Sequence, residues 1–91
     1  NSVPAVFALN QNYPNPFNPT TNITFSLANA GQTTLKVYSV LGNEVATLVN
    51  EEKSVGSYEV EFSGEELTSG IYFYQLKAGQ YSETKKMILA K

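Results

Sequence analysis

The chain has 91 residues, enough for one small domain, and it is 42% hydrophobic, 12% aromatic and 15% charged. A chain this apolar and aromatic is expected to fold. Its formal charge is −2, and it lacks arginine, aspartate, histidine, cysteine and tryptophan. These absences exclude a disulfide framework, a thiolate nucleophile and the commonest transition-metal ligands, and the acidic balance does not favour nucleic acid as a partner.

The N-terminal part divides into a linker and a proline-rich segment. Residues 1–8 have the composition of a linker. Residues 10–19 contain three prolines and show no alternation of apolar and polar positions. Because proline fixes φ and lacks a backbone donor, this segment cannot be an interior strand. We expect it to run extended, with polyproline-like geometry, across one edge or end of the domain, held by burial of Tyr13 and Phe17.

The rest of the chain alternates apolar and polar residues with a period of two, which predicts β-strands. Gly42–Asn43 and residues 78–80 predict hairpins between neighbouring runs. The last run covers residues 81–89 with Met87 and Leu89 inward, although Ile88 would fit the opposite register. Six or seven such strands predict an antiparallel two-sheet β-sandwich. The core is predicted to contain Phe25, Leu35, Val37, Tyr58, Phe62, Tyr72, Tyr74 and Met87.

The residues do not predict a catalytic or cofactor site. Ser82 and Lys85 would point to opposite faces of a strand, and the paired glutamates at 51–52 and 65–66 lie in turns, where solvated charges are common. We therefore expect no enzyme activity and no cofactor. Calcium bound by residues 51–52 and backbone carbonyls stays open as an alternative.

Surface aromatic residues suggest a second alternative, which is binding of carbohydrate by stacking. Phe73 is the best candidate, followed by Tyr38 and Tyr81. A lone exposed phenylalanine rarely forms a binding platform, so Phe73 is expected more readily to pack under the proline-rich segment.

Charge is distributed unevenly along the chain. Residues 1–80 contain three lysines and seven glutamates, whereas residues 81–91 contain three lysines and one glutamate. A basic final strand fits either a docking label for an acidic partner or protection of a sheet edge against pairing with other chains.

Four blocks occur in a familiar order: residues 9–23 (LNQNYPNPFNPTTNI), 37–45 (VYSVLGNEV), 67–76 (LTSGIYFYQL) and 85–91 (KKMILAK). Together they resemble the type A C-terminal sorting domain of proteins exported by the type IX (Por) secretion system. The resemblance implies an all-β, immunoglobulin-like antiparallel β-sandwich of about seven strands over residues 9–91, with residues 1–8 leading to an upstream cargo domain.

The resemblance also implies a non-catalytic label for export. The partners would be the outer-membrane translocon and a sortase-like peptidase that cuts near residues 1–9. The cargo would reach the cell surface or the medium of a Gram-negative-type bacterium through the periplasm. An isolated copy is expected to be a monomer. Two alternatives are a structural module like the immunoglobulin-like part of flagellar hook-capping scaffolds and a polysaccharide-binding accessory module of a secreted hydrolase.

The resemblance assigns roles to two sets of residues. The hypothesis is that the last strand, lying at a sheet edge, is the signal that the partner recognises. Recognition is assigned to Lys85, Lys86, Met87, Ile88, Leu89 and Lys91. Support of the fold is assigned to Tyr13, Pro14, Pro16, Phe17, Pro19, Gly42, Gly70 and Tyr72.

Overall fold

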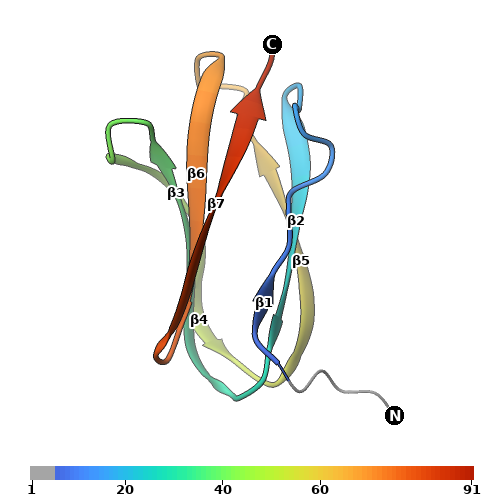
Figure 1. Cartoon of the computed structure of the whole chain (residues 1–91), viewed down its shortest axis with the longest axis vertical. Coiled ribbons are helices and arrows are strands. Elements are labelled where there is room, and N and C mark those ends of the chain that lie inside the picture. Colours follow the sequence, from blue (N-terminus) through green and yellow to red (C-terminus); the bar gives the residue numbers. More distant parts are fainter. Residues whose placement is uncertain (1–5) are drawn as a thin grey trace.

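A computed structural model describes residues 6–91, which form two packed β-sheets (Figure 1). The strands are β1 (Ala8–Leu9), β2 (Thr20–Leu27), β3 (Gly31–Ser39), β4 (Glu44–Lys53), β5 (Gly56–Ser63), β6 (Gly70–Ala78) and β7 (Tyr81–Leu89). The β-sandwich predicted from the period-two alternation is confirmed. Of the linker predicted over residues 1–8, residues 1–5 lie outside the described residues, and the domain boundary stays a prediction.

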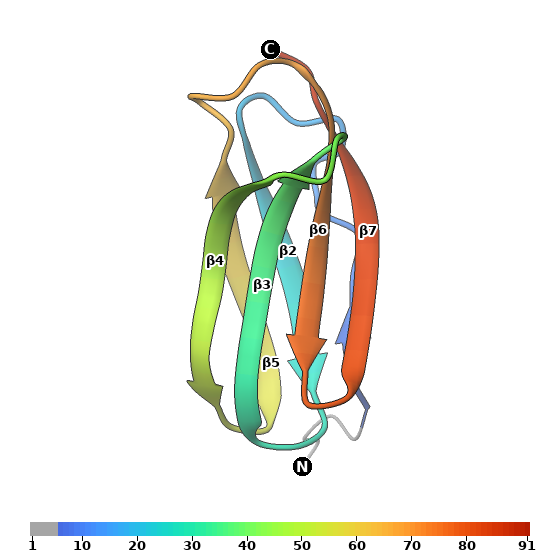
Figure 2. The same cartoon turned by 90° about the vertical axis from the view of Figure 1, so that its left-hand side faces the viewer.

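The seven strands divide into a three-stranded sheet of order β1–β2–β5 and a four-stranded sheet of order β4–β3–β6–β7, with antiparallel pairing throughout (Figure 2). The fourth strand pairs with the third, whereas in an immunoglobulin constant domain it joins the other sheet. As a result β7 lies at one edge of the larger sheet and β4 at the other. Two register shifts interrupt the pairing of β4 with β3.

The core lies between the sheets and contains alternate side chains of β2, β3 and β6, with fewer from β4, β5 and β7. Seven of the eight predicted core residues are buried, and Tyr58 is half-buried instead. Tyr58 lies on the edge strand β5, where its ring stacks on Phe25 at a centroid distance of 5.4 Å and its hydroxyl donates to the Ser54 carbonyl. The buried apolar residues are Leu9, Phe17, Ile23, Phe25, Leu27, Leu35, Val37, Val49, Phe62, Tyr72, Tyr74, Leu76, Ala78, Met87 and Leu89.

Tyr72, at the start of β6, connects its strand to the preceding loop. Its hydroxyl donates to the carbonyl of Thr68, four residues upstream, over 2.7 Å. This is the tyrosine corner found in immunoglobulin-like sandwiches at the equivalent place in the sixth strand. The supporting role predicted for Tyr72 therefore has a structural basis in this hydrogen bond.

The proline-rich segment, residues 10–19, crosses from one sheet to the other, and we call it the strap. It contains three cis X-Pro bonds, before Pro14, Pro16 and Pro19. Phe17 is buried with 1% of its surface exposed, as predicted, whereas Tyr13 is 80% exposed, so its predicted burial is wrong. Tyr13 is held by its backbone, which exchanges two 3.0 Å hydrogen bonds with Asn22 of β2.

The strap is fastened by a buried polar cluster beneath its first residues. The Tyr74 hydroxyl donates to the Asn10 carbonyl over 2.7 Å and accepts from the Asn12 amide over 2.8 Å. The Asn12 side chain is itself buried and donates to Thr21 Oγ1 and the Pro14 carbonyl. Because buried polar groups must be paired, these bonds fix the path of the strap.

Replacing Tyr74 by phenylalanine should lower the free energy of unfolding by about 1–3 kcal/mol, because it leaves buried backbone groups of the strap unpaired. Denaturant unfolding of the purified domain measures this loss. Tyr13→Phe is the matched control, since the Tyr13 side chain is largely exposed, and it should be neutral. Equal stability of the two variants would show that the Tyr74 hydroxyl does not hold the strap.

Candidate functional site

The last strand, β7, is the predicted recognition element, and its side chains alternate between the core and the outside. Met87 and Leu89 are buried, with 0% and 1% of their surfaces exposed, which confirms their predicted inward register. Lys86 and Ile88 lie on the outer face of the sheet. A partner that meets the folded domain therefore reaches Lys86 and Ile88 but not the two core residues between and after them.

The strap covers the outer edge of β7 near its end. The Phe17 amide donates to the Ile88 carbonyl, and the Ala90 amide donates to the Phe17 carbonyl, both over 2.9 Å. Asn15 Oδ1 accepts from the Ile88 amide over 3.0 Å, and Gln11 Nε2 donates to the Lys86 carbonyl over 2.8 Å. The last strand lies at a sheet edge, as predicted, but its backbone groups near Ile88 are already hydrogen-bonded within the chain.

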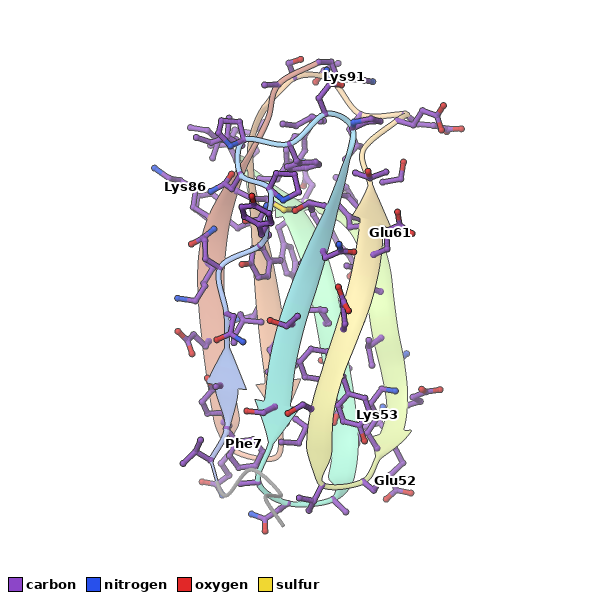
Figure 3. All side chains as sticks on the ribbon, turned by 90° about the vertical axis from the view of Figure 1, so that its right-hand side faces the viewer. Phe7, Glu52, Lys53, Glu61, Lys86 and Lys91 are labelled. Atoms are coloured by element: carbon purple, nitrogen blue, oxygen red, sulfur yellow. The ribbon has the colours of Figure 1, made fainter. Side chains whose placement is uncertain are left out.

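The three terminal lysines have different surroundings. Lys85 lies on the core-side face and forms an ion pair with Glu83 at 3.4 Å. Lys91 Nζ donates to the carbonyls of Glu65 and Leu67 over 2.6 and 2.7 Å, so Lys91 is tied to the loop between β5 and β6. Lys86 points away from the sandwich, near the same end as Lys91 (Figure 3). Two of these three lysines, Lys85 and Lys91, thus form contacts within the domain.

The start of β7 carries a small charged cluster beside β1. The Tyr81 hydroxyl donates to Glu83, and this hydrogen bond, with further help from Lys85, lowers the pKa of the Glu83 carboxyl. Burial raises the pKa of Tyr81 to about 12, and the hydrogen bond to Glu83 adds to the effect. The Tyr81 ring also stacks on Phe7 at a centroid distance of 5.0 Å. The cluster anchors the segment before β1 onto the last strand.

These features occur together with a match to one protein family. The chain matches the family described as "Secretion system C-terminal sorting domain" over residues 11–90. The chain belongs to this family. The sorting domains of the family are signals for type IX secretion, so this domain directs export to the cell surface or the medium through the type IX machinery. No curated protein matches the chain, and nothing found favours the scaffold or polysaccharide-binding alternatives.

Two glycines assigned to the support of the sorting domain have backbone conformations that favour glycine. Gly42 has a φ of +92° in the loop between β3 and β4, and Gly70 has a φ of +150° at the start of β6. A side chain at these positions would be strained, because L-residues rarely adopt such angles. The loop around Gly42 has four residues, 40–43, and is closed by hydrogen bonds between the backbones of Ser39, Gly42 and Asn43.

The aromatic candidates of the sorting domain do not lie under the strap. Phe73 and Tyr38 are directly opposite each other on β6 and β3, half-buried, on the outer face of the four-stranded sheet. Phe73 therefore lies on the other side of the sheet from Tyr72 and Tyr74, whose rings are buried in the core.

The strap amides were not identified from the sequence of the sorting domain. Gln11, Asn12 and Asn15 donate or accept the side-chain hydrogen bonds that hold the strap against β2 and β7. Their closeness to the prolines is the one available signal, because prolines lack amide donors and neighbouring polar side chains must supply the bonds.

Within residues 6–91, no three acidic side chains gather into a potential metal site, and Glu51, a candidate calcium ligand, is paired with Lys53 at 2.9 Å. The same residues contain no helix long and apolar enough to cross a membrane.

Proposed function

We propose that the type IX machinery recognises this domain in its folded form, through the side chains that the last strand presents on the outer face of the sheet. The observation that carries the proposal is the alternation along β7. Lys86 and Ile88 face outward, while Met87 and Leu89 are buried in the core. In this proposal Lys86 and Ile88 contact the partner directly, and Met87, Leu89 and Lys91 act by holding the strand in place.

The partner in this proposal is the outer-membrane translocon, which the domain and its attached cargo reach through the periplasm. The domain itself is not a catalyst. Several of its described titratable groups form surface ion pairs, such as Lys36–Glu44 and Lys85–Glu83.

Removal by a sortase-like peptidase would take place on the N-terminal side of the strap, within residues 1–9. This position is supported by the backbone pairing of the domain, which begins at β1, where Ala8 and Leu9 pair with Ser26 and Phe25 of β2. Peptidases act on exposed segments with few such bonds. Val6, which precedes the packed Phe7, is 62% exposed.

An isolated copy is proposed to be a monomer because both edges of the larger sheet are protected. The strap covers β7 near Ile88, and two register shifts disturb β4. Such irregularities are common means of preventing edge-to-edge pairing.

The proposal is tested by fusing residues 1–91 to a reporter with a periplasmic signal peptide in a type IX-competent bacterium. Deleting residues 85–91 should abolish export, since the deletion removes the outward side chains and two core residues of β7. The measurement is the fraction of reporter found outside the cells or on their surface. Glu59→Gln, at an exposed position of β5 on the other sheet, is the control and should be exported normally. Unchanged export after the deletion would contradict recognition through the last strand.

A further inference from the structure

The outer face of the four-stranded sheet combines apolar, aromatic and basic residues at one end. Residues directly opposite each other in antiparallel strands point to the same face. The pairings place Tyr38, Phe73 and Lys86 in one row across β3, β6 and β7, and Ile71 and Ile88 in the next row. None of these side chains belongs to the core between the sheets. Together with Val40 in the adjoining loop they form what we call the Phe73 face.

The Phe73 face is open and shallowly grooved. Ile71 and Ile88 are 41% and 37% exposed, and Val40 is 64% exposed. A groove of about 440 Å³ lies between Val40 and Phe73 and is also lined by Tyr38, Gln75 and Thr84. The loop of residues 40–43 projects from the end of β3 beside this groove (Figures 1 and 2). Clustered exposed apolar side chains of this kind mark interaction surfaces.

The opposite face of the sandwich has a different character. On the outer side of the three-stranded sheet, Asn22 pairs with Glu61 and Thr24 pairs with Glu59. That face is polar and acidic, whereas Lys86 and Lys77 lie on the same side of β7 and β6 as Phe73. Glu44, opposite Tyr38 on β4, is paired with Lys36 at 3.5 Å, so the basic charge next to Phe73 comes from Lys86. The two faces of the sandwich thus differ in hydropathy and in the charge of their unpaired groups.

We propose that the Phe73 face docks an apolar and acidic protein surface on a component of the secretion machinery. The inference rests on the proposed function and adds the surface and the chemistry of the partner. Apolar anchors would pack against Ile71, Ile88 and Phe73, and a carboxylate would meet Lys86. Complementary charge at such an interface accelerates encounter and excludes wrong partners.

Two other occupants fit the face less well. A second copy that met this face with its own would bring lysines toward lysines, which is unfavourable. The attached upstream domain is connected through Phe7, which lies at the end of the sandwich opposite Lys86 (Figure 3). A separate acidic protein avoids both difficulties.

The test compares the export of reporter fusions that carry single substitutions, each chosen so that the new residue is still compatible with a β-strand. Phe73→Thr removes the aromatic ring, Lys86→Glu reverses the charge, and Lys86→Arg keeps it. Glu61→Lys, on the outer side of the other sheet, is the matched charge-reversal control. Thermal unfolding of each purified fusion checks that the domain stays folded, with midpoints within about 5 °C of the parent.

We expect Phe73→Thr and Lys86→Glu to reduce export about tenfold, as loss of an interface anchor or introduction of like charge does. Lys86→Arg and Glu61→Lys should be exported like the parent. If the parent is not exported, the proposed function fails. If the parent and both Phe73-face variants are exported equally, only the docking inference is overturned.

The same fusions test whether a second copy of the domain, and not an acidic partner, occupies the Phe73 face. Light scattering on the purified parent should show a monomer. A dimer that Phe73→Thr dissociates would assign the Phe73 face to a second copy and overturn the inference. Loss of export in Phe73→Thr with normal export of Lys86→Glu would overturn the acidic character of the partner.

Discussion

Replacing Phe17 by alanine should lower the free energy of unfolding by about 3–5 kcal/mol, the usual cost of removing a buried phenylalanine. Phe17 is 1% exposed and meets the ring of Phe62 edge to face at a centroid distance of 6.1 Å. Its backbone also joins the strap to Ile88 and Ala90. Since small domains are stable by only about 5–15 kcal/mol, the variant loses a large part of the total.

Denaturant unfolding monitored by tyrosine fluorescence measures the effect of Phe17→Ala. Tyr13→Ala is the matched control, because Tyr13 is the other strap aromatic and its side chain is exposed. The control should change stability by about 0.5 kcal/mol or less. A loss below about 1 kcal/mol for Phe17→Ala would mean that the strap contributes little to the fold.

Leu89→Ala and Ile88→Ala should separate the structural from the recognition role of the last strand. Leu89 is 1% exposed and packs on Gly64, where an added Cβ would lie 2.8 Å from Leu89 Cδ2. Leu89→Ala should therefore cost about 2–5 kcal/mol of unfolding free energy. Ile88 lies on the outer face, and Ile88→Ala should cost about 1 kcal/mol or less.

The two neighbouring variants are then compared in the export assay. Ile88→Ala should stay folded at the growth temperature and still be exported several-fold less, because it removes part of the Phe73 face. Leu89→Ala should lose stability and export together. Normal export of Ile88→Ala alongside poor export of Leu89→Ala would restrict the terminal strand to a purely structural role.

The strands of this domain could be predicted from sequence because burial on one face leaves a period-two pattern. The bounds of the last run, residues 81–89, coincide with β7. The pattern also placed Met87 and Leu89 in the core. It did not show that Tyr58, in the cleanest alternation of the chain, packs against the core only half-buried, because alternation reports the face of a residue and not whether its strand lies at an edge.

In the strap, the local sequence pattern does not determine which aromatic residue is buried. Tyr13 and Phe17 are both aromatic residues next to prolines, and nothing in their neighbourhood distinguishes them. Phe17 is buried because its backbone pairs with Ile88 and Ala90, at the far end of the chain. Such pairing over long sequence separation depends on the assembled sheets and leaves no periodic signal.

The candidate site could be predicted only in part, because some of its contacts also join residues that are far apart in the sequence. The resemblance indicated the terminal residues, and alternation indicated which of them face outward. The covering of the β7 edge and the bonds of Lys91 to the Glu65 and Leu67 carbonyls required the positions of distant loops. The Phe73 face required the register of three strands, which the sequence alone does not supply.

The contact between Phe17 and the end of β7 has a consequence for how the domain is made. Phe17 is synthesised before its backbone partners, Ile88 and Ala90, which follow it at the far end of the domain. A nascent or broken chain that stops before these residues leaves the strap without its backbone partners and the core without Leu89. The strap is therefore locked, and Lys86 and Ile88 are held on an ordered strand, only once β7 has joined the sheet, so a chain cut before β7 would lack both the covered edge and these outward side chains.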